Sequence, residues 1–226
     1  MLPPVAILAG GRGTRLGELV RDTPKPLLEV AGEPFLLHQL RLLRAHGAQR
    51  VVLCVGYLAE QFEEILESVD VGLDVVCSHD EEPGTAAALR HALPLLGDEF
   101  LVLYGDAYLR IDYGDVARAR QTSGLPALMT VLPWQEGNAE VRDGRVVRYE
   151  KEGGDGLDWM DYGVQAFAAE ALELSSMRDL TELQSTLAAT GALAAYEASE
   201  RFYEIGTPAA LRETDAFLRS LSDESA

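Results

Sequence analysis

The chain has 226 residues, enough for one α/β domain or two small ones. Its formal net charge at pH 7 is −18, so its surface repels the phosphates of nucleic acids and of anionic lipids, and the sequence predicts neither nucleic acid nor a membrane as a partner. The chain is 47% apolar and 25% charged, as soluble globular proteins are, and no apolar run is long enough to span a bilayer.

Apolar runs and helical patterns alternate through the first half of the chain. Strands are predicted at 5–9, 51–55, 73–77 and 100–104, and helices at 35–43, 58–66 and 85–93. Because these strands are apolar almost without interruption, they are expected to form a parallel sheet with helices on both faces. The acidic run from Glu60 to Glu67 fits the solvent-facing side of its helix.

The pattern changes after about residue 125. A strand is predicted at 127–132, a hairpin at 141–147 across Asp143-Gly144, a strand at 164–167, and a closing helix that begins near Pro208. With no repeat and no low-complexity linker, one domain over 1–226 is expected. Its first half, 1–125, would bind a nucleotide-type ligand, and its second half, 126–226, would complete the site.

Two cysteines, Cys54 and Cys77, lie in apolar, strand-like runs and not at metal-binding or redox spacing. They are expected to be reduced core residues of a cytoplasmic protein. No export signal is recognised in the sequence.

Lysine is used at two positions only. Of the 19 basic residues 17 are arginine, and the lysines are Lys25 and Lys151. A compact, flexible ammonium is not equivalent to a planar guanidinium where a single phosphate oxygen has to be reached, so both lysines are candidate phosphate ligands. Chance survival in an arginine-rich composition is the alternative.

A glycine-rich segment, Leu8 to Leu16, follows the first strand. Its small residues let backbone amides approach a phosphate chain, and its arginines add charge-assisted hydrogen bonds. It is not a Rossmann fingerprint, because Leu16 stands where the third glycine is needed, and no Gly-Lys-Ser/Thr follows as in a P-loop. A plain tight turn is the alternative.

The second motif, Thr23-Pro24-Lys25-Pro26-Leu27, holds Lys25 between two prolines that restrict the local backbone. Together with Gly10-Gly11-x-Gly13-Thr14-Arg15-Leu16, it resembles the signature of the sugar-1-phosphate nucleotidyltransferases. Residues 23–35 and 51–57 are similar to D-glycero-D-manno-heptose 1-phosphate guanylyltransferases in particular. The resemblance implies an α/β, Rossmann-like three-layer sandwich of the nucleotide-diphospho-sugar transferase type, with a mostly parallel mixed sheet.

The resemblance also implies which residues bind the nucleotide. Arg15, Lys25 and Asp106 would be catalytic, with Arg15 and Lys25 stabilising charge as the α-phosphorus is attacked. The nucleotide-binding residues would be Leu8, Ala9, Gly10, Gly11, Arg12, Gly13, Thr14, Asp80, Pro83, Gly84 and Thr85. An Asp80 carboxylate could accept hydrogen bonds from guanine N1 and N2, which favours GTP. Alternatively, the acidic residues before Thr85 only complement a helix N-terminus.

The remaining residues implied by the resemblance would hold the metal and the sugar phosphate. Asp106 and Glu204 would bind Mg²⁺, although a lone Gly-Asp after a strand is often just a turn. The sugar-phosphate residues would be Tyr104, Glu150, Lys151, Asp161, Tyr162 and Gly163. Asp161 replaces an asparagine of the family and is an alternative metal ligand, and Tyr162 has core packing as its alternative role.

The function expected from the sequence is transfer of a nucleotidyl group from an NTP, with GTP favoured, to a sugar 1-phosphate of the heptose or mannose type. The products would be an NDP-sugar and pyrophosphate, and the partners an NTP and the sugar 1-phosphate. Two alternatives stay open. One is a CTP- or UTP-dependent transferase with another phosphate or phosphonate acceptor, and the other is a non-catalytic nucleotide- or sugar-sensing subunit. The oligomeric state is not readable from the sequence.

Overall fold

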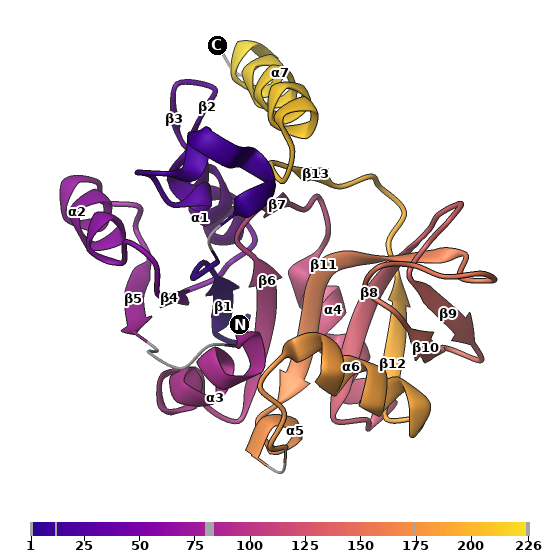
Figure 1. Ribbon diagram of the computed structural model, residues 1–226. Helices are drawn as coiled ribbons and strands as arrows, with labels where there is room; N and C mark the ends of the chain where they lie inside the picture. Colours follow the sequence, from indigo (N-terminus) through magenta and orange to yellow (C-terminus); the bar gives the residue numbers. More distant parts are fainter. Residues whose placement is uncertain (1, 12, 80–83, 174, 225–226) are drawn as a thin grey trace.

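The structure is a computed structural model that describes residues 2–11, 13–79, 84–173 and 175–224. Within these residues nine strands form one sheet, in the order β5-β4-β1-β6-β11-β8-β12-β10-β9 (Figure 1). These strands are β1 (Val5–Leu8), β4 (Arg50–Val55), β5 (Asp74–His79), β6 (Glu99–Tyr104), β8 (Ala127–Pro133), β9 (Ala139–Arg142), β10 (Arg145–Tyr149), β11 (Trp159–Ala168) and β12 (Leu193–Glu197).

The helices and the shorter elements connect and cover this sheet. The α-helices are α1 (Phe35–Ala45), α2 (Glu60–Ser68), α3 (Thr85–Leu96), α4 (Tyr113–Ser123), α5 (Glu170–Glu173), α6 (Leu180–Ala189) and α7 (Pro208–Glu224). Two short antiparallel sheets of two strands each pair β2 (Glu29–Val30) with β3 (Glu33–Pro34) and β7 (Ala107–Tyr108) with β13 (Tyr203–Glu204). Two 3-10 helices span Thr14–Val20 and Lys25–Leu27.

The first half of the chain forms the parallel part of the sheet, as its apolar strands predict. β1 lies between β4 and β6 and is parallel to both, and Val5 pairs with Val51 and with Leu101. Val5, Ala6 and Ile7 are completely buried, because helices cover both faces of the strand.

The second half makes the sheet mixed. β11 runs antiparallel to both β6 and β8, while β12 runs parallel to β8. The predicted hairpin forms as β9 and β10, with Asp143 and Gly144 at positive φ in its turn. Parallel pairing is therefore concentrated on the β1 side, and antiparallel pairing on the β11 side.

Helices form a layer on each face of the sheet, and the strand periodicity of two separates the two layers. On β1, Val5 and Ile7 join the core with α1, α2 and α4, whereas Ala6 joins the core with α3, α5 and α6. Figure 1 shows α6 in front of β8 and β11, and α4 behind them. The expected three-layer α/β sandwich is confirmed.

The end of the chain returns to its beginning. β13 pairs with β7, and the α7 helix that follows lies beside the β2–β3 turn (Figure 1). The ring of Tyr203 stacks on that of Phe217 with centroids 3.8 Å apart, and Asp215 accepts a hydrogen bond of 2.7 Å from the Ala31 amide. These contacts hold β13 against the carboxyl end of β6.

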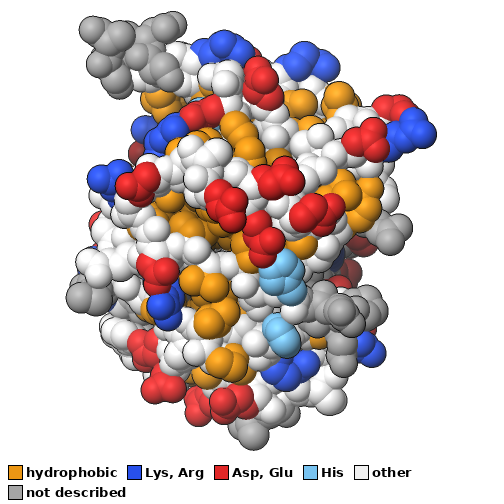
Figure 2. All heavy atoms as spheres, turned by 90° about the vertical axis from the view of Figure 1, so that its left-hand side faces the viewer, with side chains coloured by type: hydrophobic (Ala, Val, Ile, Leu, Met, Phe, Trp, Pro, Cys, Tyr) orange, Lys and Arg blue, Asp and Glu red, His pale blue; other side chains and the backbone are white. Residues whose placement is uncertain are grey.

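α2 exposes its acidic side chains, as expected. Phe62 is completely buried beneath the helix, and Figure 2 shows acidic side chains gathered on this face of the molecule. The exposed acids of the helix are Glu60, Glu63, Glu64 and Glu67.

Cys54 is buried and Cys77 is partly buried, and no disulfide joins them in the described part of the chain. Burial, with a smaller contribution from Glu63, raises the pKa of the Cys77 thiol to about 11, so this cysteine is a thiol and not a thiolate at neutral pH. Within the described ranges, no helix is long and apolar enough to cross a membrane.

Candidate functional site

The loop after β1 lies against the end of β6. The Gly105 amide donates a hydrogen bond of 3.0 Å to the Leu8 carbonyl. A Cβ atom at Gly105 would lie 2.7 Å from that carbonyl oxygen and 3.1 Å from Cγ of Pro26. Glycine at 105 therefore allows the Leu8–Ala9 backbone, the Pro26 ring and the end of β6 to meet at the carboxyl ends of parallel strands, where α/β folds bind ligands.

The glycine-rich loop and the lysine motif also meet each other. Gly13 has a left-handed conformation with φ of 59°, and a Cβ atom there would lie 3.3 Å from Cβ of Lys25. On the other side, a Cβ at Gly10 would lie 3.3 Å from the Gly56 amide at the end of β4. The structure thus brings together the two motifs that the sequence analysis singled out.

Lys25 forms an ion pair with Asp106, between Nζ and Oδ2. Only 11% of the lysine side chain and 27% of the aspartate side chain are exposed. Lys25 begins a short 3-10 helix after Pro24, and the Leu27 and Leu28 amides close its turns onto the Pro24 and Lys25 carbonyls. The ammonium group therefore sits on a well-anchored turn, at the loop that follows β6.

Glu204 comes to the same place from the far end of the chain. It pairs with Ala107 in the β7–β13 ladder, and the Ile205 amide donates a 2.9 Å hydrogen bond to the Asp106 carbonyl. The Glu204 carboxylate accepts a hydrogen bond from the Gly206 amide. A Cβ atom at Gly206 would lie 3.2 Å from Nζ of Lys25, so Gly206 borders both the glutamate and the lysine.

The donor set of this cluster fits Mg²⁺. Asp106 and Glu204 offer carboxylate oxygens only, and among the described residues no group of three or more His, Cys, Asp or Glu side chains could hold a metal. Mg²⁺ typically takes one or two carboxylates and completes its shell with water and substrate phosphates. Asp106 and Glu204 are therefore suited to a metal that binds together with a phosphate-bearing ligand.

Thr14 and Arg15 are exposed and begin the 3-10 segment Thr14–Val20, which is kinked at Gly17. Within the described part of the chain, Arg15 has no ion-pair partner. Arg12 lies outside the described residues.

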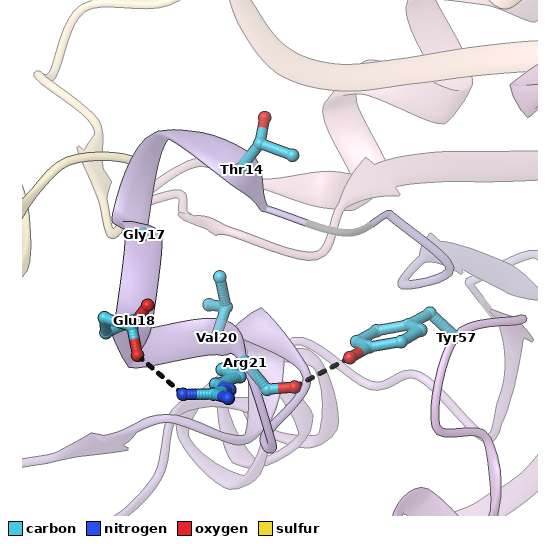
Figure 3. A pocket seen from close by; sticks show the side chains of 6 residues that line it. All are labelled: Thr14, Gly17, Glu18, Val20, Arg21 and Tyr57. Atoms are coloured by element: carbon cyan, nitrogen blue, oxygen red, sulfur yellow. Dashed lines mark hydrogen bonds and ion pairs between the residues drawn. The ribbon is translucent and has the colours of Figure 1, made fainter.

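A hollow of about 570 Å³ borders this 3-10 helix, and the Tyr57 hydroxyl closes one side by donating a 2.7 Å hydrogen bond to the Arg21 carbonyl (Figure 3). The residues that line it are Thr14, Gly17, Glu18, Val20, Arg21 and Tyr57. Of the predicted nucleotide residues, only Thr14 is among them.

Asp161 is the centre of a second polar cluster. Its Oδ2 accepts hydrogen bonds from the Tyr104 hydroxyl at 3.1 Å, the Tyr149 hydroxyl at 3.4 Å and the Gln165 amide at 3.3 Å. Its Oδ1 accepts a 3.0 Å hydrogen bond from the Gly163 amide. Burial raises the pKa of the Asp161 carboxyl, and these hydrogen bonds oppose that rise.

The predicted sugar-phosphate residues differ in how far they are exposed to solvent. Glu150 and Lys151 are exposed; Glu150 accepts a 2.7 Å hydrogen bond from Arg148, and Lys151 has no ion-pair partner within the described ranges. Asn138 links this pair to the Asp161 cluster, because its carbonyl accepts from the Glu150 amide and its side chain accepts from the Asp161 amide, at 2.9 and 2.8 Å.

Tyr162 is buried and packs edge-on against Phe202, with ring centroids 5.8 Å apart. It belongs to the core on the α1 side of the sheet, which is the surrounding expected for its alternative role in packing.

The structure also gives Gly84 and Thr85 structural tasks. A Cβ atom at Gly84 would lie 2.3 Å from the Arg178 carbonyl oxygen, which accepts hydrogen bonds from the Ala86 and Ala87 amides at the start of α3. The Thr85 hydroxyl accepts a 2.8 Å hydrogen bond from the Leu180 amide at the start of α6. Asp80 and Pro83, the other predicted base-contacting residues, lie outside the described residues.

Sequence reasoning missed three residues of the Asp161 cluster: Asn138, Tyr149 and Gln165. A single polar residue in an apolar strand, such as Gln165, was the only available signal. Their roles depend on how the strands pair, which the sequence does not display.

Comparison with known proteins agrees with this architecture. Residues 5–198 match the family of MobA-like NTP transferase domains. The catalytic subunit beta of mannose-1-phosphate guanylyltransferase from Danio rerio is 31% identical over 89% of this chain and 61% of its own length. The corresponding subunit from Drosophila pseudoobscura pseudoobscura is 37% identical over 65% of this chain and 40% of its own length. The chain thus spans about half the length of these guanylyltransferases.

Two further proteins match over nearly their whole length. N-acetylmuramate alpha-1-phosphate uridylyltransferase from Neisseria meningitidis serogroup B is 30% identical over 93% of this chain and 96% of its own length. HddC from Yersinia pseudotuberculosis, which has also been solved complexed with GMP-PN, has the same fold with a TM-score of 0.83 at 24% identity, over 96% of this chain and 100% of that one.

The sheet topology, with a lysine and two carboxylates at the carboxyl end of its parallel part, defines a nucleotidyltransferase-like α/β protein. The chain belongs to the family of MobA-like NTP transferase domains, and its resemblance to sugar-1-phosphate nucleotidyltransferases is confirmed.

Gly84→Ala should destabilise the protein by about 2 kcal/mol or more, because the added Cβ would displace the Arg178 carbonyl that caps α3. Gly97→Ala is the matched control: its φ is also positive, at 77°, but nothing lies within 4 Å, so only the conformational cost of about 1 kcal/mol is expected. Urea denaturation would measure both, and equal losses would contradict the capping role of Arg178.

Asp161→Asn should change the pH dependence of stability. The pKa of Asp161 is raised in the folded state. Its contribution to the free energy of unfolding is therefore fully present below the pKa of the unfolded chain, about 4, and is lost as the pH rises through the folded-state pKa. The melting temperature of the variant relative to wild type should therefore increase from pH 4 to pH 7.

The control has the opposite sign. Hydrogen bonds from Arg219 and the Ala31 amide lower the pKa of Asp215. Its contribution to the free energy of unfolding is therefore present at neutral pH and is lost as the pH falls. Asp215→Asn should be the less stable protein at pH 7, with the difference closing toward low pH. If the difference in melting temperature between Asp161→Asn and wild type did not change with pH, the raised pKa of Asp161 would be contradicted.

Proposed function

We propose that this chain transfers a nucleotidyl group from a nucleoside triphosphate to a sugar 1-phosphate and releases pyrophosphate. The observation that carries the proposal is the meeting of Lys25, Asp106 and Glu204 beside the glycine-rich loop after β1. A cation and two carboxylates beside a loop of small residues suit a triphosphate that binds with a divalent metal.

The reaction needs positioning and charge neutralisation more than a base. An oxygen of the sugar phosphate, already anionic, attacks the α-phosphorus, and the bond from that phosphorus to the oxygen bridging to the β-phosphate breaks as pyrophosphate leaves. Lys25 and Arg15 would stabilise the negative charge on the α-phosphoryl and leaving groups. Glu150 and Lys151, exposed after β10, would hold the sugar phosphate.

Asp106 and Glu204 would hold Mg²⁺. When bound, the metal supplies electrostatic stabilisation to the phosphates. Lys25, which pairs with Asp106 in this structure, would have the triphosphate as an additional anionic partner.

GTP is the favoured nucleotide, supported by the guanylyltransferase relatives. The same relatives support a mannose-type sugar 1-phosphate, and the similarity of residues 23–35 and 51–57 supports a heptose type. UTP is the second candidate, because the Neisseria uridylyltransferase is matched over 96% of its own length. A cytoplasmic location is supported by the two cysteines, which lie in β4 and β5 and form no disulfide within the described residues.

Pyrophosphate release tests the proposal directly. GTP, UTP, CTP, dTTP and ATP would each be incubated with Mg²⁺ and with mannose, heptose, glucose or N-acetylmuramic acid 1-phosphate. Release with one pair identifies the nucleotide and the sugar together. Release only with phosphocholine or a phosphonate would transfer the proposal to that acceptor class, and no release from any pair would overturn catalysis in favour of a sensing role.

Lys25→Ala should lower kcat about 10²- to 10³-fold, because it removes a preorganised positive charge from the reacting phosphates. Its melting temperature should stay near that of wild type, since the Asp106 carboxylate is 27% exposed and can be solvated. Arg50→Ala, which removes an exposed ion pair with Asp74 at the sheet edge, is the control. Activity retained by Lys25→Ala would exclude this site as the centre of the reaction.

Glu204→Gln should raise the Mg²⁺ concentration needed for half-maximal activity, because one of two charged ligands becomes neutral. A Mg²⁺ titration of pyrophosphate release measures this, with Glu67→Gln on the exposed face of α2 as the control. An unchanged Mg²⁺ requirement would remove Glu204 from the metal site.

A further inference from the structure

Tyr57 and Gln61 hold the backbone that joins the glycine-rich segment to Lys25. The Tyr57 hydroxyl donates a hydrogen bond of 2.7 Å to the Arg21 carbonyl (Figure 3). The Gln61 side-chain amide donates one of 2.9 Å to the next carbonyl along the chain, that of Asp22. Two side chains from the start of α2 and the turn before it thus bind two consecutive carbonyls in the connection between the two phosphate motifs.

These two bonds are the long-range hydrogen bonds of residues 14–23. Within the described part of the chain, the other hydrogen bonds of these residues stay inside the segment or reach Gly13. The buried side chains of the segment join a small cluster that is separate from the main core and consists of Leu16, Val20 and Leu28. Tyr57 and Gln61 are therefore the polar contacts that fix this segment to the parallel part of the sheet.

The two donors come from a well-defined turn between β4 and α2. Phe62 is completely buried and anchors the first turn of α2, and the Gln61 backbone amide donates a 3.2 Å hydrogen bond to the Leu58 carbonyl. Leu58 has a left-handed conformation with φ of 54°, which is rare for a leucine and persists where the surrounding structure fixes it. The turn therefore presents Tyr57 and Gln61 in a fixed arrangement.

Val20 connects this anchor to the candidate site. It directly precedes Arg21 and is 5% exposed. A Cβ atom at Gly13 would lie 3.4 Å from Cγ1 of Val20 and 3.3 Å from Cβ of Lys25, so Gly13 packs between these two side chains. The backbone between them is not a continuous helix, because Gly17 has φ of 57° and ψ of −125°. The position of the segment therefore depends on where its end is held.

The two bonds are placed where they affect mobility more than stability. Arg21 and Asp22 are exposed, and Tyr57 and Gln61 are partly exposed. If a donor is removed, water can reach the carbonyl, so the penalty for an unpaired buried group does not arise. The expected effect of losing either donor is greater conformational freedom of residues 14–23.

We propose that Tyr57 and Gln61 are positioning residues for the nucleoside triphosphate, which hold residues 14–23 so that the glycine-rich segment, Arg15 and Lys25 face the phosphates together; this rests on the proposed function. Ordering these groups in advance avoids the entropy cost of ordering them when the nucleotide binds. The proposed sugar-phosphate residues follow β10, which is far from β4 in the order of the sheet. The effect is therefore specific to the nucleotide.

Tyr57→Phe tests this inference, because it removes the hydroxyl and keeps the ring. We expect a KM about tenfold higher for GTP, or for the nucleotide that pyrophosphate release identifies, because the segment then has to be ordered on binding. The KM for the sugar 1-phosphate and the melting temperature should stay near those of wild type. An unchanged nucleotide KM, or equal rises in both KM values, would overturn the inference. Should Tyr57→Phe fail to fold, Gln61→Met carries the same test.

Tyr113→Phe and Ser68→Ala are the matched controls. The Tyr113 hydroxyl donates a 3.0 Å hydrogen bond to the Leu109 carbonyl, and both residues are buried in the core. Its removal should lower the melting temperature and leave both KM values unchanged, the reverse of the pattern for Tyr57→Phe. Ser68→Ala removes an exposed side-chain hydrogen bond from the last turn of α2 and should change neither KM. A higher nucleotide KM in Tyr113→Phe as well would assign the effect to general loosening and overturn the inference.

Limited trypsin digestion measures the anchoring without turnover. Arg15 and Arg21 are exposed cleavage sites in the segment, whereas Pro26 prevents cleavage after Lys25. Tyr57→Phe should be cut after Arg15 or Arg21 about tenfold faster than wild type, with the products identified by mass spectrometry. Equal rates would overturn the inference whether or not the chain is a transferase. Faster cleavage of the variant, with no pyrophosphate release by wild type, would support the anchoring and overturn the proposed function alone.

Discussion

The return of the chain to the end of β6 is the contact on which the site depends. Asp106 follows β6, and Glu204 reaches it only because β13 pairs with β7 and the Ile205 amide bonds to the Asp106 carbonyl. That two-residue ladder is too short to be stable alone. α7 secures it, through the stacked rings of Tyr203 and Phe217 and the carboxylate of Asp215 on the Ala31 amide. The α7 helix thus helps to hold Glu204 beside Asp106, the two carboxylates proposed to bind a metal.

Electrostatics explain why so acidic a chain can have a phosphate site. The net charge is −18, so attraction of a triphosphate has to be local. Lys25 supplies a nearly buried cation, but Asp106 and Glu204 beside it offset that charge. Under the proposed function, the cluster would therefore favour a phosphate that arrives with a divalent cation over a bare anion, and the two carboxylates would contribute to binding as well as to the chemical step.

The sequence predicted the first half of the fold well, because fully buried parallel strands are continuous apolar runs at 5–9, 51–55 and 100–104. A common site for Lys25 and the glycine-rich loop was implied by the resemblance of the two motifs to the sugar-1-phosphate nucleotidyltransferase signature, and the structure brings them together. α4 was missed because only Tyr113, Val116 and Arg120 of its eleven residues are buried, so its apolar pattern is weak. Tyr149 and Gln165 were missed for another reason: they are ordinary residues until β11 pairs with β8 across a bulge and both side chains reach Asp161.

Gly84 and Thr85 show how one residue pattern supports two interpretations. A glycine before a helix suggests a backbone that comes close to something, and a phosphate at the helix N-terminus is the functional interpretation. Here the neighbour is the Arg178 carbonyl, which accepts from the Ala86 and Ala87 amides. Because the Ala86 and Ala87 amides donate to the chain's own Arg178 carbonyl, the N-terminus of α3 has fewer free N–H groups for an anion than an uncapped helix would have. Under the proposed function, phosphate recognition would then fall to the loop after β1 and to side-chain cations, which is consistent with a lysine at position 25 in a chain otherwise rich in arginine.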